Sequence, residues 1–402
     1  MNILFLSINV PPGDKRDKIT YNFIWKEMKY LALRGHRVYY LSNLNDDKME
    51  DGIFFISKSQ RLEKHTFLRR FNNLLFCLKN LLFLFPLVRE SVQSTVHICG
   101  IERAIIRCIK EFHIDIIHTN FFEPSGEAAV LSARHCRIPI VATLRGAELE
   151  KMPELDYGAC LDKYYETALK NSIRFVDFFT APNKFLCNKL HRDFGVPREK
   201  IKYIPNGVER ISSCGDNLKL DDYMTFISIG RLIKRKNLDL IFNSLPNLFR
   251  QNRFKWIIVG DGPLKKNYET IIGKYYSNKV YLHDEMPKEK LLSIICKSNC
   301  LIHPSFFEGL PNVVLEALSL GVPCLVSDIP AHQDLIIEGF NGFFFDPHDS
   351  MDFVRKMKFI LSNRNVLHKM RNNCIESARK YPIEGKIDTY IEIYNNVLKS
   401  HC

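Results

Sequence analysis

The sequence predicts an α/β protein of two facing Rossmann-like, doubly wound domains with a cleft between them. Its 402 residues exceed the length at which one hydrophobic core keeps growing, so two domains are expected. Short apolar runs alternate with segments of helical spacing along the chain. This alternation restarts after a polar break at residues 209–222, the expected linker. Doubly wound sheets bind ligands at the carboxyl ends of their strands, so the chemistry is expected in the strand-to-helix loops.

The elements follow in order along the chain. In the first half, strands are expected at residues 3–8, 36–41, 115–118, 139–144, 175–180 and 201–204, and helices at 21–33, 127–136 and 184–194. In the second half, strands are expected at 225–229, 255–259, 279–282, 300–303, 323–326 and 342–345, and helices at 238–249, 264–276, 288–297, 312–319 and 351–363. Continuous apolar strands between helices are typical of a parallel sheet covered on both faces. The predicted domains are therefore 1–210 and 222–382, and a final helix within 383–402 is expected to pack on the first.

Composition narrows the class of protein. A formal net charge of +12 favours anionic partners such as phosphorylated ligands, nucleic acid or an acidic membrane surface. The twelve cysteines are scattered singly, without a CxxC pair or zinc spacing, which indicates reduced thiols and a cytoplasmic protein. The apolar start of the chain has no basic region before it, and the longest apolar stretch, at 81–88, is too short to span a bilayer.

Four strand-to-helix loops of the second domain carry residues suited to a ligand. They contain Gly230-Arg231 followed by Lys234, Arg235 and Lys236, then residues 260–263, 303–305 and 307–317. In the last loop, Pro311 is expected at the first helical position, which leaves the amides of Asn312 and Val313 free to bind a phosphate. Because Arg231 and Lys236 come from a neighbouring strand end, this helix start predicts a diphosphate site that also stabilises a leaving nucleoside diphosphate. A solvated charge run is the alternative for the cations, and a simple turn for 260–263.

Two glutamates flank the same helix start. Glu316 lies about one turn into the helix, where its carboxylate can accept hydrogen bonds from a ribose diol. Glu308 precedes the helix and can contact hydroxyl groups of a donor sugar. A pair of glutamates is weak by itself, but Gly-Leu-Pro between a strand and a helix makes the pattern specific.

Through these residues the chain resembles glycosyltransferase family 4, whose members are retaining, nucleotide-sugar-dependent enzymes of the GT-B fold. The resemblance runs from the first strand to the terminal helix, and residues 205–208, 34–36 and 327–328 match its interdomain and framework motifs. It implies that Glu308 contacts the transferred sugar, Glu316 the ribose, and Arg231 with Lys236 the diphosphate. It further implies that no metal or other cofactor is needed, and that the departing phosphate itself accepts the proton of the attacking hydroxyl. The catalytic candidates are Glu308, Arg231 and Lys236; the donor-binding candidates are Gly13, Gly230, Gly260, Gly309, Leu310, Pro311, Asn312, Val313 and Glu316.

The first domain departs from the family pattern. Relatives often carry a Gly-Gly pair after the first strand, whereas here only Gly13 can bring backbone close to the donor, with Lys15 or Arg16 supplying charge. Arg145 stands where many relatives have His, and a guanidinium cannot serve as a general base. It can clamp an anionic donor or acceptor, so altered substrate choice is favoured over lost activity. His118 resembles a position near the acceptor, with a structural histidine as the alternative.

A basic, apolar segment at 66–89 alternates Phe and Leu with Lys and Arg at near-helical spacing. Such a helix suits a membrane interface, although an ordinary amphipathic helix packed on the sheet explains the same pattern. The sequence therefore predicts a cytoplasmic enzyme, peripheral at the inner face of the membrane.

The favoured function is transfer of a sugar from a UDP- or GDP-sugar to a saccharide or lipid-linked saccharide, in bacterial-type polysaccharide or glycoconjugate biosynthesis. A non-catalytic sugar-nucleotide-binding subunit and a nucleotide-sugar epimerase of the same architecture are the alternatives. Nucleic-acid binding is disfavoured, because the charge is accompanied by no recognition module.

Overall fold

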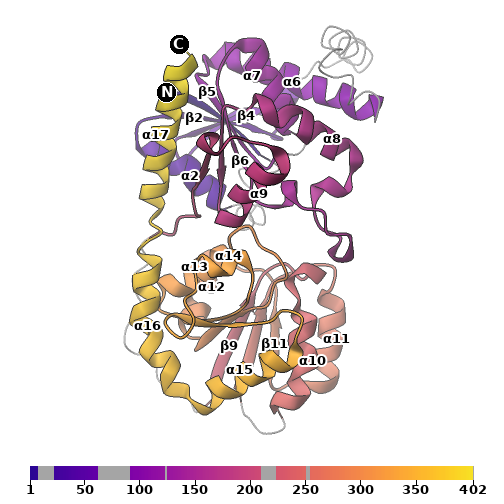
Figure 1. The fold of residues 1–402 in the computed structure, drawn as a ribbon, viewed down its shortest axis with the longest axis vertical. Helices are drawn as coiled ribbons and strands as arrows, with labels where there is room; N and C mark the ends of the chain where they lie inside the picture. Colours follow the sequence, from indigo (N-terminus) through magenta and orange to yellow (C-terminus); the bar gives the residue numbers. More distant parts are fainter. Residues whose placement is uncertain (8–21, 62–90, 123–124, 210–222, 250–253, 402) are drawn as a thin grey trace. The chain divides into compact units, whose positions relative to one another are not determined.

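The computed structural model describes residues 1–7, 22–61, 91–122, 125–209, 223–249 and 254–401. The chain divides into two compact units (Figure 1). Unit 1 comprises Met1–Pro205 and Ile383–Cys402, and unit 2 comprises Asn206–Pro382. Except for Glu209, the predicted linker lies outside the described residues.

Unit 1 is built on an eight-stranded sheet of order β3-β4-β2-β1-β5-β6-β7-β8, in which only β3 runs antiparallel to its neighbour. The strands are β1 (Asn2–Leu6), β2 (Arg37–Ser42), β3 (Lys48–Glu50), β4 (Ile53–Ser57), β5 (Ile116–Asn120), β6 (Ile140–Thr143), β7 (Phe178–Ala181) and β8 (Ile201–Tyr203). The central strands β1, β5 and β6 are buried except at the partly exposed Asn2, as expected where helices cover both faces of a parallel sheet. The strand order reverses between β1 and β5.

The helices of unit 1 have boundaries that local chemistry explains. The Asn183 side chain accepts a hydrogen bond from the Leu186 amide at 2.7 Å and so caps α9, which Gly195 ends in the left-handed region at φ 68°. The helices before the final one are α2 (Asn22–Leu33), α3 (Lys58–Arg61), α6 (Val92–Phe112), α7 (Ser125–Cys136), α8 (Lys163–Ser172) and α9 (Lys184–Phe194).

The last helix, α17 (Ile383–His401), belongs to unit 1 although it follows unit 2 in sequence. Figure 1 shows it in yellow, running beside α2. Its apolar residues recur every three or four positions, so they form one face. That face packs into the core that α2 and the sheet share, through Ile383, Ile387, Tyr390, Ile393, Tyr394 and Val397.

Unit 2 is built on a six-stranded, all-parallel sheet of order β11-β10-β9-β12-β13-β14. Its strands are β9 (Met224–Ile229), β10 (Phe254–Val259), β11 (Val280–His283), β12 (Cys300–His303), β13 (Cys324–Ser327) and β14 (Gly342–Phe345). Its helices are α10 (Leu238–Phe249), α11 (Lys265–Tyr275), α12 (Lys288–Cys296), α13 (Asn312–Ser319), α14 (Pro330–Gln333), α15 (Ser350–Ser362) and α16 (Arg364–Ala378). The order reverses between β9 and β12, so the loops after these two strands open side by side at the carboxyl edge.

Two polar side chains in the core of unit 2 form hydrogen bonds that join its central strands. Trp256 on β10 donates its indole N–H to the Ser228 hydroxyl at 3.1 Å, and Ser228 donates to the Ile302 carbonyl at 2.8 Å. These bonds tie β10, β9 and β12 together below the reversal point. None of the described helices has the length and hydropathy needed to cross a membrane.

Candidate functional site

The candidate donor site lies at the reversal point of the unit 2 sheet. The loops after β9 and β12 line a small pocket there, whose walls include Gly230, Arg231, Lys236, His303 and Ser305. This is where a doubly wound sheet binds its ligand, because neighbouring strands lead their loops to opposite sides. Arg231 is exposed at the pocket, as a contact to an anionic ligand requires.

Two glycines let the loops after β9 and β10 approach each other closely. A Cβ on Gly260 would stand 2.0 Å from the Gly230 carbonyl oxygen, and Gly260 has a φ of 159°. The Gly230 amide donates to the Val259 carbonyl at 3.1 Å, and the Leu232 amide to the Asp261 carbonyl at 2.8 Å. Backbone packing therefore explains these glycines without a ligand, in line with the turn alternative for residues 260–263.

The helix start at α13 differs from the prediction in one respect. Pro311 is the N-cap, with extended backbone (φ −77°, ψ 109°), and the first helical residue is Asn312. The correction does not remove the free amides: Val314 donates the first helical bond, to the Pro311 carbonyl at 3.1 Å. The amides of Asn312 and Val313 precede it and have no acceptor within the helix. Asn206, from the predicted interdomain motif, donates its side-chain amide to the Leu310 carbonyl at 3.1 Å and so supports the loop.

Glu308 lies in this loop and is surrounded by cations. Its Oε1 accepts a hydrogen bond from the Lys236 ammonium at 2.5 Å, and its Oε2 lies 3.1 Å from the Arg235 guanidinium. The His303 Nε2 is 3.7 Å from Oε1. Lys236 and Arg235 come from a short 3-10 turn, Lys234–Lys236, which ends at Asn237 in the left-handed region at φ 52°. The strand order thus brings together residues separated by about 70 positions in the sequence.

These neighbours fix the ionisation of the site. Burial by itself raises the pKa of Glu308, but the charges of Lys236 and Arg235 outweigh it and hold that pKa well below its ordinary range. Burial lowers the pKa of His303 well below its ordinary value, and the charge of nearby Lys236 adds to the effect. Glu308 is therefore an anion and His303 is neutral at physiological pH.

Glu316, on α13, also has a cationic partner. Lys288, the first residue of α12, forms an ion pair with its Oε1. The two side chains are 26% and 16% exposed, so the pair sits at the surface of the site and Glu316 stays within reach of a ligand. A carboxylate with one oxygen on a lysine still has acceptor capacity on the other.

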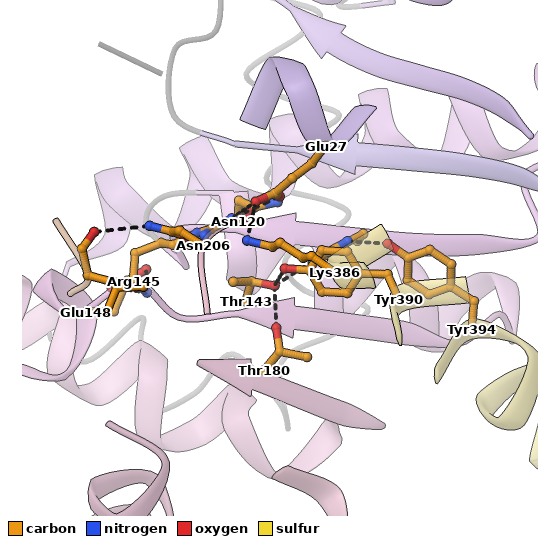
Figure 2. A network of polar contacts seen from close by, with 12 residues as sticks. Glu27, Asn120, Thr143, Arg145, Glu148, Thr180, Asn206, Lys386, Tyr390 and Tyr394 are labelled. Carbon is orange, nitrogen blue, oxygen red and sulfur yellow. Dashed lines mark hydrogen bonds and ion pairs between the residues drawn. The ribbon is translucent and has the colours of Figure 1, made fainter. Parts of the chain in front are cut away.

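The two candidates in unit 1 that the structure describes, Arg145 and His118, are both buried. Arg145 belongs to a polar network (Figure 2). Arg145 is paired with Glu27 at 2.9 Å and also donates through Nε to Asn120 at 3.2 Å. Lys386, from α17, lies 2.7 Å from the same Glu27 carboxylate. The geometry favours a structural role for Arg145 over the predicted substrate clamp, because its guanidinium is buried and bonded to Glu27 and Asn120 within the unit.

His118 is likewise structural in this geometry. It lies within β5, not at its end as predicted, and is 0% exposed. Its Nδ1 is 2.5 Å from the Tyr394 hydroxyl, and its Nε2 is 2.7 Å from the Thr143 hydroxyl. Burial lowers its pKa to about 3, so it is neutral. Both ring nitrogens are occupied by the protein, which favours the structural alternative over acceptor contact.

The remaining candidates of the first domain, Gly13, Lys15 and Arg16, lie outside the described residues, as does the segment 66–89. Across the ranges that are described, no group of three or more His, Cys, Asp or Glu side chains is arranged to hold a metal ion.

Two family models match the chain. Residues 214–381 match the model of "Glycosyl transferases group 1", and residues 22–210 match "Glycosyltransferase Family 4". The chain belongs to glycosyltransferase family 4.

Named relatives of this family 4 glycosyltransferase include enzymes that build saccharides. The chain is 27% identical over 315 residues to the UDP-Gal:alpha-D-GlcNAc-diphosphoundecaprenol alpha-1,3-galactosyltransferase of Escherichia coli, covering 72% of this chain and 78% of that protein. It is 22% identical over 298 residues to the GalNAc-alpha-(1->4)-GalNAc-alpha-(1->3)-diNAcBac-PP-undecaprenol alpha-1,4-N-acetyl-D-galactosaminyltransferase of Campylobacter jejuni, covering 73% of this chain and 78% of that protein. Among solved structures, sucrose-phosphate synthase from Thermosynechococcus elongatus superposes on this chain with a TM-score of 0.75 at 15% identity, and the match covers 100% of each chain. This similarity shows that the two proteins share the GT-B fold.

In this family 4 enzyme, sequence reasoning pointed to the loop of the candidate donor site but missed part of its charge arrangement. The sequence pattern marks Arg235 only as one member of a charge run and marks no role for Lys288. Arg235 lies between Lys234 and the pocket residue Lys236, and this position was the only sign in the sequence that it belongs to the site. A local pattern does not show which of three adjacent cations turns towards Glu308 and which turns to solvent. Lys288 carried no signal, because its partner Glu316 lies on another helix.

Proposed function

We propose that the protein is a retaining glycosyltransferase that moves a sugar from a UDP- or GDP-sugar to a saccharide or lipid-linked saccharide in bacterial-type glycoconjugate biosynthesis. The transferase class and the family are established above. We propose three further properties of the enzyme: its nucleotide-sugar donor, its retention of anomeric configuration and its saccharide acceptor.

One observation carries the donor assignment. The free amides that open α13, the exposed guanidinium of Arg231 and the ammonium of Lys236 all belong to the carboxyl edge of one sheet, at its reversal point. Such a site suits a diphosphate, since fixed dipoles and two cations address the same anion. The same groups stabilise the charge that grows on a leaving nucleoside diphosphate, which favours group transfer over simple binding.

Within this proposal the two glutamates have separate tasks. Glu316 accepts hydrogen bonds from the ribose, and ionised Glu308 accepts hydrogen bonds from hydroxyl groups of the transferred sugar. The acceptor hydroxyl attacks the face from which the diphosphate leaves, and a phosphate oxygen takes its proton. The sugar then keeps its anomeric configuration. The reaction proceeds without a protein-bound metal, because Arg231, Lys236 and the helix start supply the positive charge.

Two features support a lipid-linked acceptor at an anionic membrane. The names of the two relatives above specify undecaprenol-diphosphate-linked saccharides. The sequence at 66–89 combines Lys and Arg with Phe and Leu, a composition that binds acidic lipid surfaces. Vesicle flotation checks the membrane contact: exchanging Arg69 and Arg70 for Gln should release the protein from acidic vesicles, and flotation equal to that of the wild type would refute it.

The donor is tested first by thermal shift with a panel of UDP- and GDP-sugars, because a ligand that binds the folded state raises its apparent stability. The best donor is then incubated with undecaprenyl-diphosphate-linked mono- and disaccharides, and the anomeric configuration of the product is read by NMR. The proposal expects one nucleotide class to stabilise the protein and a product with retained configuration. An inverted product refutes the mechanism. Epimerised free donor, or binding with neither transfer nor donor hydrolysis, refutes transfer in favour of the epimerase or the non-catalytic subunit.

A further inference from the structure

Arg235 is bonded to three successive residues of the loop that carries Glu308. Its backbone carbonyl accepts a hydrogen bond from the Phe306 amide at 2.9 Å. Its guanidinium donates to the Phe307 carbonyl and lies 3.1 Å from Glu308 Oε2. The arginine therefore ties the turn after β9 to the loop after β12 by backbone and side chain together.

The neighbouring Lys236 reaches the same carboxylate in a different way. It binds the other oxygen, Oε1, and its side chain also lines the pocket at the reversal point. A Cβ on Gly230 would lie 3.3 Å from the Lys236 Cε, so the lysine runs over the backbone at the pocket wall. Arg235 is not among the residues that line this pocket. Only one of the two cations is thus placed to meet a ligand in it.

This division matters once a diphosphate binds. A Lys ammonium is a compact charge on a flexible stem, whereas a guanidinium holds a planar fork of donors in a fixed geometry. When Lys236 turns to the diphosphate, Glu308 loses its bond at Oε1. A carboxylate left in a buried site without a cation is unfavourable, and it either moves or takes up a proton.

We propose that Arg235 is a positioning residue that fixes the Glu308 loop and keeps the carboxylate aimed at the donor sugar while Lys236 binds the diphosphate. The inference rests on the proposed function, because it presumes a nucleotide-sugar donor in this pocket. Arg235 itself contacts neither the donor nor the acceptor.

The proposal makes the charge state of Glu308 an observable. Within the described part of the chain, four groups face this carboxylate: Lys236 and Arg235 from the turn after β9, His303 from β12 and His332 from α14. Burial lowers the pKa of His303 well below its ordinary value and that of His332 to about 4, so neither imidazole replaces a lost cation at neutral pH. Removing Arg235 therefore raises the pKa of Glu308, and activity is lost at a higher pH on acidification.

The experiment measures hydrolysis of the UDP- or GDP-sugar that most stabilises the wild type, by release of the nucleoside diphosphate, as a function of donor concentration and pH. Arg235→Gln keeps a donor group for the Phe307 carbonyl but removes the charge, and Arg235→Lys keeps the charge without the fork. Lys234→Gln is the matched control, since Lys234 is exposed on the same turn. Donor-induced thermal stabilisation of each variant verifies that the fold and the diphosphate site are intact.

We expect Arg235→Gln to lower kcat at least about tenfold, roughly 1.4 kcal/mol of barrier, and to leave KM within about threefold of the wild type. The acidic limb of the pH–rate profile should move to higher pH in Arg235→Gln and should stay in place in Arg235→Lys. Lys234→Gln should match the wild type in rate and in pH profile. An Arg235→Gln variant with unchanged kcat and acid limb overturns the proposal, as does one that loses donor binding together with turnover. If the wild type itself neither binds nor hydrolyses any nucleotide sugar, the proposed function fails and this inference fails with it.

Discussion

The buried network of unit 1 makes a quantitative prediction for Glu27→Gln. Glu27 is 0% exposed and is the shared partner of Arg145 and Lys386, whose side chains are 6% and 3% exposed. The substitution preserves volume but removes the only carboxylate that these two contacts share. Arg145 and Lys386 then both lose the carboxylate that they contact at 2.9 and 2.7 Å.

The magnitude follows from the carboxylate itself. Burial raises the pKa of Glu27, but Arg145 and Lys386 outweigh it and lower that pKa from 4.5 to about 2. A difference of this size corresponds to roughly 3 kcal/mol. Removing one partner of a buried ion pair costs about 3–5 kcal/mol in other proteins, which agrees. We therefore expect Glu27→Gln to lower the free energy of unfolding of unit 1 by about 3 kcal/mol.

The sign of the pH dependence follows from the lowered pKa. The stabilisation by Glu27 is present above the ordinary value of 4.5 and is lost as the pH falls towards about 2. The wild type should lose this part of its stability on acidification, and Glu27→Gln should lack it.

The two tryptophans of the chain allow the units to be followed separately. Trp25 lies on α2 in unit 1, and Trp256 lies on β10 in unit 2. Urea unfolding monitored by fluorescence in a Trp256→Phe background therefore reports unit 1. The matched control is Asp388→Asn, which breaks the exposed pair between Arg34 on the α2 side and Asp388 on α17. That change should cost no more than about 1 kcal/mol. If Glu27→Gln costs as little as the control, the network does not stabilise unit 1 and the reasoning is refuted.

Three further predictions concern catalysis. Glu308→Gln should lower turnover about a hundredfold or more but leave nucleoside diphosphate binding equal or tighter, because Lys236 is released for the ligand. Titration calorimetry measures the binding and a rate assay measures the turnover. Undiminished turnover would contradict the assignment of Glu308. Lys288→Ala should raise the donor KM severalfold, about tenfold at most, with little change in kcat, because Glu316 loses the cation that holds it. The control is Lys290→Ala, at an exposed position of the same helix, which should change neither KM nor kcat. An unaltered KM for Lys288→Ala argues against the pairing of Lys288 with Glu316. Treatment with EDTA should leave the initial rate within about twofold of the untreated enzyme, and a loss that Mg²⁺ or Mn²⁺ restores would show that a metal takes part.

Local patterns predicted much of the architecture. The helices at 184–194 and 238–249 begin and end where the sequence placed them, because apolar periodicity and end signals coincide there. No element was predicted for β3, β4, α6, α8 or α16. β3 is a polar edge strand, and α8 and α16 are rich in polar residues, so their apolar signal is weak.

By itself, the sequence determined the two βα series, the parallel sheets and the loop of Glu308 and Glu316, because each follows from a pattern among residues that are close together in the sequence. Only the tertiary structure decided which charges meet. Lys236 meets Glu308 because β9 lies beside β12, although some 70 residues separate the two in the sequence. Lys386 on α17 meets Glu27 although the whole of unit 2 lies between them in the sequence. No local periodicity encodes such pairings. They arise when strand order and core packing bring distant segments together, and burial then requires each charge to have a partner.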